Sequence, residues 1–210
     1  MKQSLTPIAL SLLAALLAGC NASVTPPSST GSDANSSATA MENTSDTQEE
    51  TSPMTAEDKI DNAMSAGPAL IATEATVLDW PATATGDLSE LRKGTNGWTC
   101  LPNYPGSPGN DPLCVDAKAM EWFKAYMSKK EPKMTQAGIG YMLQGGSDAS
   151  NTDPFAEKPA PGEDWMTAPP HIMVFSAGKL DPKVYGTEMN GGPWIMWAGT
   201  PYEHLMIPVE

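Results

Sequence analysis

The sequence predicts an α+β fold in which an antiparallel sheet packs against one main helix and is stapled by a disulfide. Three observations predict it. Short extended segments recur between Gly- and Pro-rich turns. Only one long segment carries apolar residues at helical spacing. Two cysteines flank a loop that holds four prolines and little sign of regular structure.

Two segments carry helix signals. Residues 55–66 begin at Thr55, a good N-cap residue with Asp58 three positions later, and end before a Gly-Pro pair. The main helix starts after Asp116 and stops before Pro132, since proline cannot continue a helix. Its apolar face is expected to contain Ala119, Met120, Phe123 and Met127.

Strands are predicted at residues 75–80, 139–143, 171–175, 194–197 and 202–209. Residues 88–101 predict a hairpin, because Asn96-Gly97 is a favoured turn dipeptide between two extended segments. Residues 144–170 are rich in Gly, Asp, Ser and Pro, which predicts a long ordered loop. Pro208 is expected at a sheet edge or at the end of the last strand.

The start of the chain has the character of an export signal. Lys2 supplies positive charge, and residues 8–18 are apolar apart from Ser11. This run is about half the ~20 residues that a membrane-spanning helix needs, which is typical of a signal peptide. It ends in the sequence Leu17-Ala18-Gly19-Cys20.

This start resembles the signal peptide and lipobox of bacterial lipoproteins. The resemblance implies export, removal of residues 1–19, and a membrane anchor of acyl groups such as palmitate on Cys20. In such proteins an aspartate after the cysteine marks retention in the inner membrane. Asn21 therefore implies the outer membrane, with the protein on its periplasmic side. The alternative is an ordinary secretory signal followed by an incidental cysteine.

Composition divides the remaining chain into two parts. Residues 20–56 are dominated by Ser, Thr, Ala and Asn, and they contain no aromatic residue. Such a segment lacks the apolar surface needed to offset the entropy of ordering it. We therefore expect a lipidated flexible tether, with a partner-binding tail as the alternative. Residues 57–210, which hold all six tryptophans, are expected to form a single periplasmic domain.

The net charge of the chain limits the classes of partner that we expect it to bind. The net charge is −13, and Arg92 is the only arginine. Nucleic-acid binding needs a basic footprint, so no nucleic-acid partner is expected. The partners that remain are the membrane, through the N-terminal lipid, and an envelope protein, cell-wall material or a small molecule.

The cysteines suggest a covalent staple. If Cys20 carries lipid, Cys100 and Cys114 remain as a pair in an oxidising compartment. We expect a structural disulfide, and closing a loop of about fifteen residues is worth roughly 3 kcal/mol in the chain-entropy model. A zinc pair or a redox dithiol are the alternatives, but C-x-x-C spacing and neighbouring histidines are both missing.

The only two histidines stand in matching contexts, His171-x-Met173 and His204-x-Met206. Alternate residues of a strand share one face, so each imidazole shares a face with a thioether. If the two strands pair in register, all four side chains meet on one surface, and thioethers select reduced copper. Copper is therefore the only cofactor that we consider for this protein from its sequence. The alternative is a half-buried strand in which methionine fills core space.

Ser147 supports a third hypothesis, a serine hydrolase. It follows a predicted strand, with His171 or His204 available as base and Asp148 or Asp153 to orient that base. The G-x-S-x-G elbow of such enzymes is absent, and Gly, Ser and Asp after a strand also form ordinary turns.

Aromatic residues of the last third can stack on a sugar or peptide ligand, or they can form the core. They are Trp165, Tyr185, Trp194, Trp197 and Tyr202. The stretches Gly97-Trp98-Thr99-Cys100 and Gly192-Pro193-Trp194 are similar to small exported bacterial proteins of unknown function, which implies no activity. The leading hypothesis is thus a non-enzymatic binding or structural role in the envelope, followed by copper binding.

Overall fold

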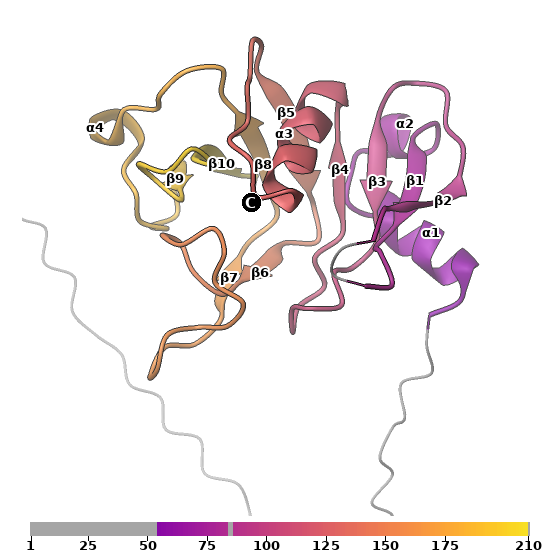
Figure 1. The fold of residues 1–210 in the computed structure, drawn as a ribbon, viewed down its shortest axis with the longest axis horizontal. Coiled ribbons are helices and arrows are strands. Elements are labelled where there is room, and N and C mark those ends of the chain that lie inside the picture. Colours follow the sequence, from indigo (N-terminus) through magenta and orange to yellow (C-terminus); the bar gives the residue numbers. More distant parts are fainter. Residues whose placement is uncertain (1–53, 84–85, 210) are drawn as a thin grey trace, which may run out of the picture. The chain divides into compact units, whose positions relative to one another are not determined.

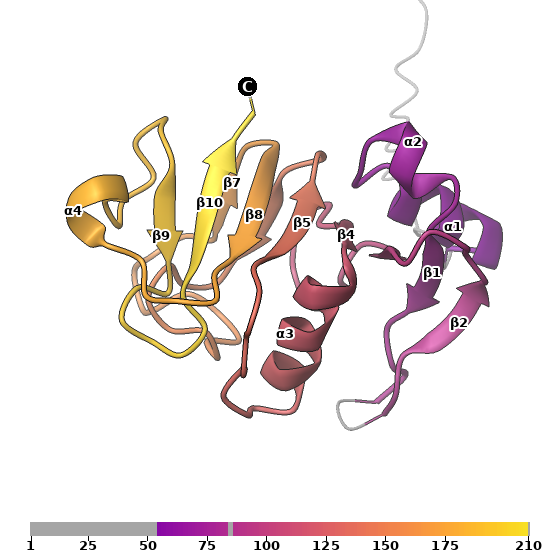
Figure 2. The same ribbon diagram turned by 90° about the horizontal axis from the view of Figure 1, so that it is seen from above.

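The computed structural model describes residues 54–83 and 86–209, which form a mixed eight-stranded sheet with helices on both faces (Figure 1). The strand order is β2-β1-β3-β4-β5-β8-β10-β9 (Figure 1), and Figure 2 shows the same sheet from above. These strands are β1 (Thr76–Asp79), β2 (Ser89–Arg92), β3 (Thr99–Leu101), β4 (Leu113–Val115), β5 (Gly138–Met142), β8 (His171–Phe175), β9 (Trp194–Met196) and β10 (His204–Pro208). A second sheet pairs β6 (Gly146–Asp148) with β7 (Met166–Ala168). The helices are α1 (Ala56–Met64), α2 (Ala69–Ala72), α3 (Ala117–Met127) and α4 (Pro182–Tyr185).

Both predicted helices are present and begin at the predicted caps. In α1, the Thr55 hydroxyl accepts a hydrogen bond from the Asp58 backbone N–H at 3.2 Å, and the Asp58 carboxylate accepts one from the Thr55 N–H at 2.9 Å. In α3, the Asp116 carboxylate accepts from the N–H of Ala119 at 2.7 Å and from that of Ile139 at 3.0 Å. The Asp116 side chain therefore caps α3 and also ties it to β5.

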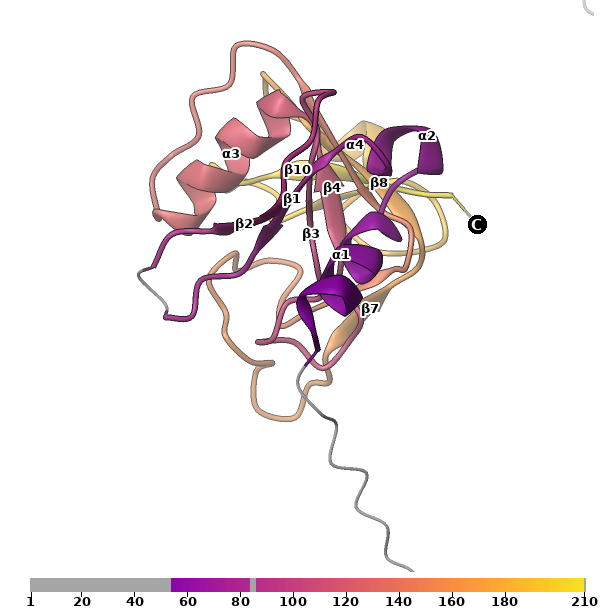
Figure 3. The same ribbon diagram turned by 90° about the vertical axis from the view of Figure 1, so that its right-hand side faces the viewer.

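Helices α1 and α3 cover opposite faces of the sheet, each over its own apolar cluster (Figure 3). The larger cluster lies under α3, where Trp122 and Phe123 are buried. The smaller cluster lies under α1, around Ala63 and the two cysteines. The predicted apolar face of α3 is correct except at its end, because Met127 is the last helical residue and is 39% exposed.

The sheet is mixed, which corrects the expectation of a purely antiparallel one. Strand β1 pairs with β2 antiparallel and with β3 parallel, so β2 and β3 do not form the predicted hairpin. Residues 93–98 instead cross the end of β1, where the Thr95 N–H donates to the Glu74 carbonyl at 2.8 Å. Asn96-Gly97 does turn the chain, with Gly97 at φ 79°. A turn dipeptide specifies that the chain reverses direction. It does not specify that another strand, here β1, lies between the two strands that the turn joins.

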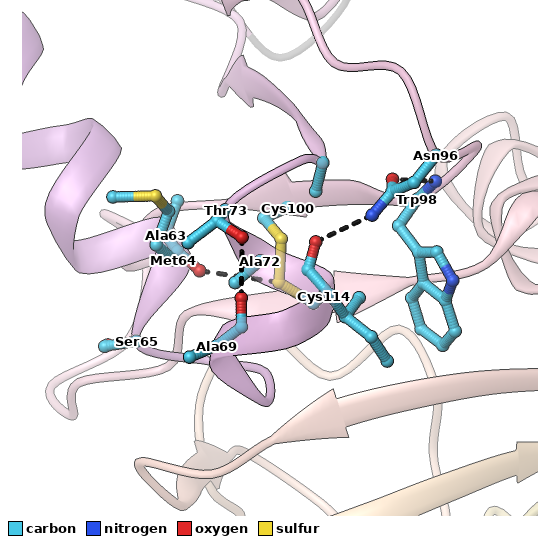
Figure 4. Close-up of a disulfide and its surroundings, with 12 residues drawn as sticks. Ala63, Met64, Ser65, Ala69, Ala72, Thr73, Asn96, Trp98, Cys100 and Cys114 are labelled. Atoms are coloured by element: carbon cyan, nitrogen blue, oxygen red, sulfur yellow. Dashed lines mark hydrogen bonds between the residues drawn. A yellow bond between two sulfur atoms is a disulfide. The ribbon is translucent and has the colours of Figure 1, made fainter.

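The predicted disulfide joins two residues that face each other across neighbouring strands, Cys100 of β3 and Cys114 of β4. Both are fully buried. The carbonyl of Ala63, in α1, lies 3.6 Å from the Cys114 sulfur (Figure 4). The disulfide therefore connects the β3–β4 pair and forms part of the surface on which α1 packs.

The other predicted strands correspond to β1, β5, β8, β9 and β10, and Pro208 is the last residue of β10. The segment predicted as one long loop, residues 144–170, contains the β6–β7 pair. Strand β4 and the short helices α2 and α4 were not predicted. None of the helices in the described part of the chain is long and apolar enough to cross a membrane.

Candidate functional site

The residues expected to bind copper share one face of the β8–β10 ladder but do not converge. Met206 lies opposite Met173, and Pro208 lies opposite His171. His204 therefore sits at the other end of the ladder, with its ring 5.2 Å from that of Phe175. Four strand positions amount to about 13 Å, so the two imidazoles cannot reach one ion. The strands do pair as expected, but their register separates the two histidines.

His171 is buried with one ring nitrogen unused. Its Nδ1 lies 2.7 Å from the Pro169 carbonyl, which accepts hydrogen bonds only, so Nδ1 carries the proton. The Nε2 then bears a lone pair, and it has no hydrogen-bond partner among the described residues. Burial lowers the pKa of His171, which keeps the ring neutral at pH 7.

Met142 is the nearest cross-strand neighbour of His171 that bears a metal-binding atom. The two residues are directly paired between β5 and β8. The sequence predicted both strands but not their pairing, so Met142 was missed as a candidate. Within residues 54–83 and 86–209, no group of three His, Cys, Asp or Glu side chains is placed to hold a metal ion. Any site at His171 would therefore depend on thioethers.

His204 is a core residue held among aromatic rings. Its ring centroid lies 5.4 Å from Trp122, 5.2 Å from Phe175 and 5.1 Å from Trp197. Its Nδ1 lies 3.0 Å from the Tyr202 carbonyl. Burial in this aromatic environment lowers the pKa of His204 to about 4, because the charged form loses its hydration.

Ser147 is engaged by a carboxylate rather than by an imidazole. Its hydroxyl donates to Asp111 at 2.9 Å and accepts from the Gly109 N–H at 3.1 Å. The Asp111 carboxylate, 5% exposed, also accepts from the Ser147 N–H at 2.7 Å. Asp148, expected to orient a base, instead accepts from the Ser150 N–H at 2.9 Å. These contacts tie the β3–β4 loop to β6, and the described hydrogen bonds include none between Ser147 and a histidine.

A pocket of about 440 Å³ opens at the carboxyl ends of the two parallel strands, β1 and β3. That volume lies within the range of about 300–1,000 Å³ that small-molecule sites occupy. Its lining includes Lys59, Asp79, Trp80, Pro102, Asn103 and Pro105. We call it the Trp80 pocket. Ligands of open sheets commonly bind outside the carboxyl ends of parallel strands, and this pocket has that position.

Trp80 is half-buried and its ring is fixed from several sides. The indole N–H donates to the Pro102 carbonyl at 2.7 Å. The ring makes edge contacts with Tyr104, at 4.9 Å between centroids, and with Phe123, at 5.9 Å. The sequence pattern points only to aromatic residues of the last third as surfaces on which a ligand could stack. The available signal for Trp80 was its place between Asp79 and Pro81, where β1 ends.

Two opposite charges sit beside this ring. The Lys59 ammonium donates to the Asp79 carboxylate at 2.6 Å, and both side chains are partly exposed. The second oxygen of Asp79 accepts from the backbone N–H of Trp80 at 2.9 Å. The pocket thus combines a fixed aromatic ring with a donor and an acceptor that neutralise each other.

The aromatic residues proposed as ligand platforms belong mostly to the core. Trp194, Trp197 and Tyr202 are all less than 7% exposed. Tyr185 is 38% exposed, at the end of α4. Core packing therefore accounts for the three buried rings, as the alternative interpretation expected.

Cys20 and the other residues of the predicted signal and tether, up to Pro53, lie outside the described residues. Comparison with protein-family models, with curated proteins and with solved structures gave no match.

Proposed function

We propose that this chain is a lipid-anchored protein of the outer membrane whose periplasmic domain binds an uncharged saccharide of the envelope without catalysis. The observation that carries the binding role is the Trp80 pocket, where a fixed ring lies beside the Lys59–Asp79 pair. The anchor is supported by the lipobox resemblance at Cys20.

The fixed ring favours a saccharide. A sugar presents an apolar face of C–H groups, which packs on an aromatic ring, and a rim of hydroxyls. The Trp80 ring is held by the hydrogen bond from its indole N–H to the Pro102 carbonyl and by edge contacts with two other aromatic rings. Little side-chain entropy is therefore lost when a ligand packs on it.

The charges favour an uncharged ligand. Lys59 and Asp79 neutralise each other, while each keeps further capacity to donate to or accept from a hydroxyl. The net charge of −13 repels anionic glycans at long range. We propose binding rather than hydrolysis because the Ser147 hydroxyl is held by Asp111 and not by an imidazole.

Titration of the full-length chain with soluble chito-oligosaccharides, followed by tryptophan fluorescence and calorimetry, tests the binding role. We expect Trp80→Ala to weaken binding by at least about tenfold, which corresponds to about 1.4 kcal/mol. Trp165→Ala is the matched control, because Trp165 is also partly exposed but does not line the pocket. Equal affinities of the two variants, or no binding by the unmodified chain, would overturn the proposal.

The anchor has its own test. Growth of a Gram-negative host with labelled palmitate should label the chain and place it in the outer-membrane fraction. The Cys20→Ala variant should remain unlabelled and leave that fraction. Labelling that persists in Cys20→Ala would contradict the anchor while leaving the saccharide site untouched.

A further inference from the structure

The unused Nε2 of His171 is the only buried side-chain nitrogen or oxygen in the described residues without a hydrogen-bond partner. A buried polar atom without a hydrogen bond lowers the stability of the fold by about 1–3 kcal/mol, so a ligand on this lone pair would offset a real cost. We infer that His171 Nε2 and the sulfur of Met142 bind a cuprous ion, with the sulfur of Met173 as a third ligand. This site goes beyond the proposed saccharide binding and does not depend on it.

The sheet brings these three side chains together. Met142 of β5 lies directly opposite His171 of β8, on the same face of the sheet. Met173 follows His171 by two positions and therefore shares that face. It lies opposite Gly140, where a Cβ would come 2.9 Å from its terminal methyl group. The absent side chain of Gly140 thus leaves room for the end of Met173 over β5, near Phe175 and Val115 and two positions from Met142 along the strand.

Gly146 shows independently that Met142 and the imidazole approach one point. A Cβ placed on Gly146 would lie 2.8 Å from the terminal methyl of Met142, 3.6 Å from its sulfur, and 3.7 Å from Cε1 of His171. Cε1 is bonded to Nε2 in the ring. The end of the Met142 side chain and the edge of the His171 ring therefore both lie within 4 Å of one point beside β6.

The hydrogen bond of the other ring nitrogen prepares the imidazole for a metal. Nδ1–H donates to the Pro169 carbonyl at 2.7 Å, which fixes the ring orientation and leaves the lone pair on Nε2. Metal-bound histidines commonly donate their second nitrogen to a carbonyl in this way. His171 is 1% exposed, so water does not compete readily for that lone pair.

The donor set selects the ion. An imidazole and two thioethers are uncharged, and soft thioether sulfur prefers Cu(I) over harder divalent ions. A monovalent ion also loses less hydration on burial than a divalent one.

His204 provides a matched control within the same chain. Its Nδ1 also faces the carbonyl two residues earlier, and its ring is also buried. Met196 of β9 lies directly opposite His204, but three aromatic rings pack around the His204 ring, which distinguishes its surroundings from those of His171. A variant at His204 therefore removes a buried imidazole without removing the proposed ligand.

The test is competition for Cu(I) between the full-length chain and the chromogenic chelator bicinchoninate, under anaerobic conditions with ascorbate, a reductant too weak to open the Cys100–Cys114 disulfide. All proteins carry Cys20→Ser so that a free thiol does not bind copper. We expect one ion per chain, affinity lowered by about tenfold or more in His171→Ala and in Met142→Leu, and affinity unchanged within about threefold in His204→Ala. Met142→Leu conserves volume, so it tests the site even where His171→Ala impairs folding.

A spectroscopic readout locates the ion. Silver(I), which has the same ligand preference without redox chemistry, should shift the methyl NMR signals of Met142 and Met173 and leave that of the exposed Met54 in place. Equal Cu(I) affinity in the unmodified chain and in Met142→Leu, or an unmoved Met142 methyl signal, would overturn the inference.

Discussion

His171 and His204 each direct Nδ1 at the carbonyl two residues earlier, at 2.7 Å from Pro169 and 3.0 Å from Tyr202, yet they lie at opposite ends of the β8–β10 ladder. The His204 ring packs among three aromatic rings and lies opposite Met196, whereas the His171 ring lies opposite Met142 and its Nε2 has no hydrogen-bond partner among the described residues. Two similar sequence contexts therefore give two different environments, which bear on the acid stability that depends on His204 and on the copper site proposed at His171.

His204 should make the protein less stable in acid. Its pKa is about 4 in the folded state because of burial, against 6.5 when exposed, so the unfolded chain takes up the proton first as pH falls. The full stabilisation is present above about pH 6.5, and on the order of 3 kcal/mol is lost as pH falls to about 4. Urea unfolding at pH values between 7.5 and 4 measures it. His204→Phe should have a smaller loss over this range; an identical loss would contradict the assignment.

Asp148 should act in the opposite direction. Burial raises the pKa of this carboxyl to about 6, with the charge of Asp111 as a further contribution, so the folded state holds the proton more tightly than the unfolded chain. Its ionised form is therefore destabilising at pH 7, and that penalty disappears as pH falls from about 7 toward 4.

We expect Asp148→Asn to raise the free energy of unfolding at pH 7 by about 1–2 kcal/mol, because the amide oxygen can still accept from the Ser150 N–H. Asp153→Asn is the control, since Asp153 is exposed and accepts from the Phe155 N–H in the same kind of local turn. Its effect should stay within about 0.5 kcal/mol. A destabilised Asp148→Asn would show that its charge is needed.

The disulfide should be worth several kcal/mol. Cys100 and Cys114 are 14 residues apart, and closing a loop of that length stabilises by roughly 3 kcal/mol in the chain-entropy model. We expect the double variant Cys100→Ala, Cys114→Ala to lose about that amount in urea unfolding. Reductant should lower the stability of the unmodified chain and leave the double variant unaffected. Free thiols in protein purified from the periplasm would contradict the pairing.

The crossing of residues 93–98 over β1 can be tested with two glycines. A Cβ at Gly94 would lie 2.1 Å from the Thr76 nitrogen, so Gly94→Ala must displace backbone and should cost more than about 3 kcal/mol. Gly97 has φ 79° but open space around it, so Gly97→Ala should cost only about 1–2 kcal/mol. Thermal unfolding of both variants measures the difference. Similar losses would mean that this segment does not lie against β1.

Much of the local structure could be predicted because its causes lie within a few residues. Thr55 and Asp58 form the cap of α1 within one turn, and Asp116 caps α3 in the same manner. The strands 139–143 and 171–175 follow from short apolar segments between turn residues. The hairpin prediction failed because Asn96-Gly97 specifies a turn, whereas the partner of each arm is β1, which precedes both.

The candidate sites were less predictable. His171 and Met173 were recognised from alternation along one strand, but Met142 joins them only through the pairing of β5 with β8. Trp80 was missed because its pocket combines the ends of β1 and β3 with Lys59 from α1. In both cases the sequence does not show which segment, distant along the chain, lies next to the recognised strand.

The sequence by itself determined the helix caps, most of the strands, the Cys100–Cys114 pair and the acidic charge, since these depend on neighbouring residues, composition or a count of cysteines. Only the tertiary structure decided that His171 lies opposite Met142 and Pro208 rather than near His204. The reason is physical: side chains alternate along a strand whatever its neighbours, whereas the register between strands is set by packing across the whole sheet.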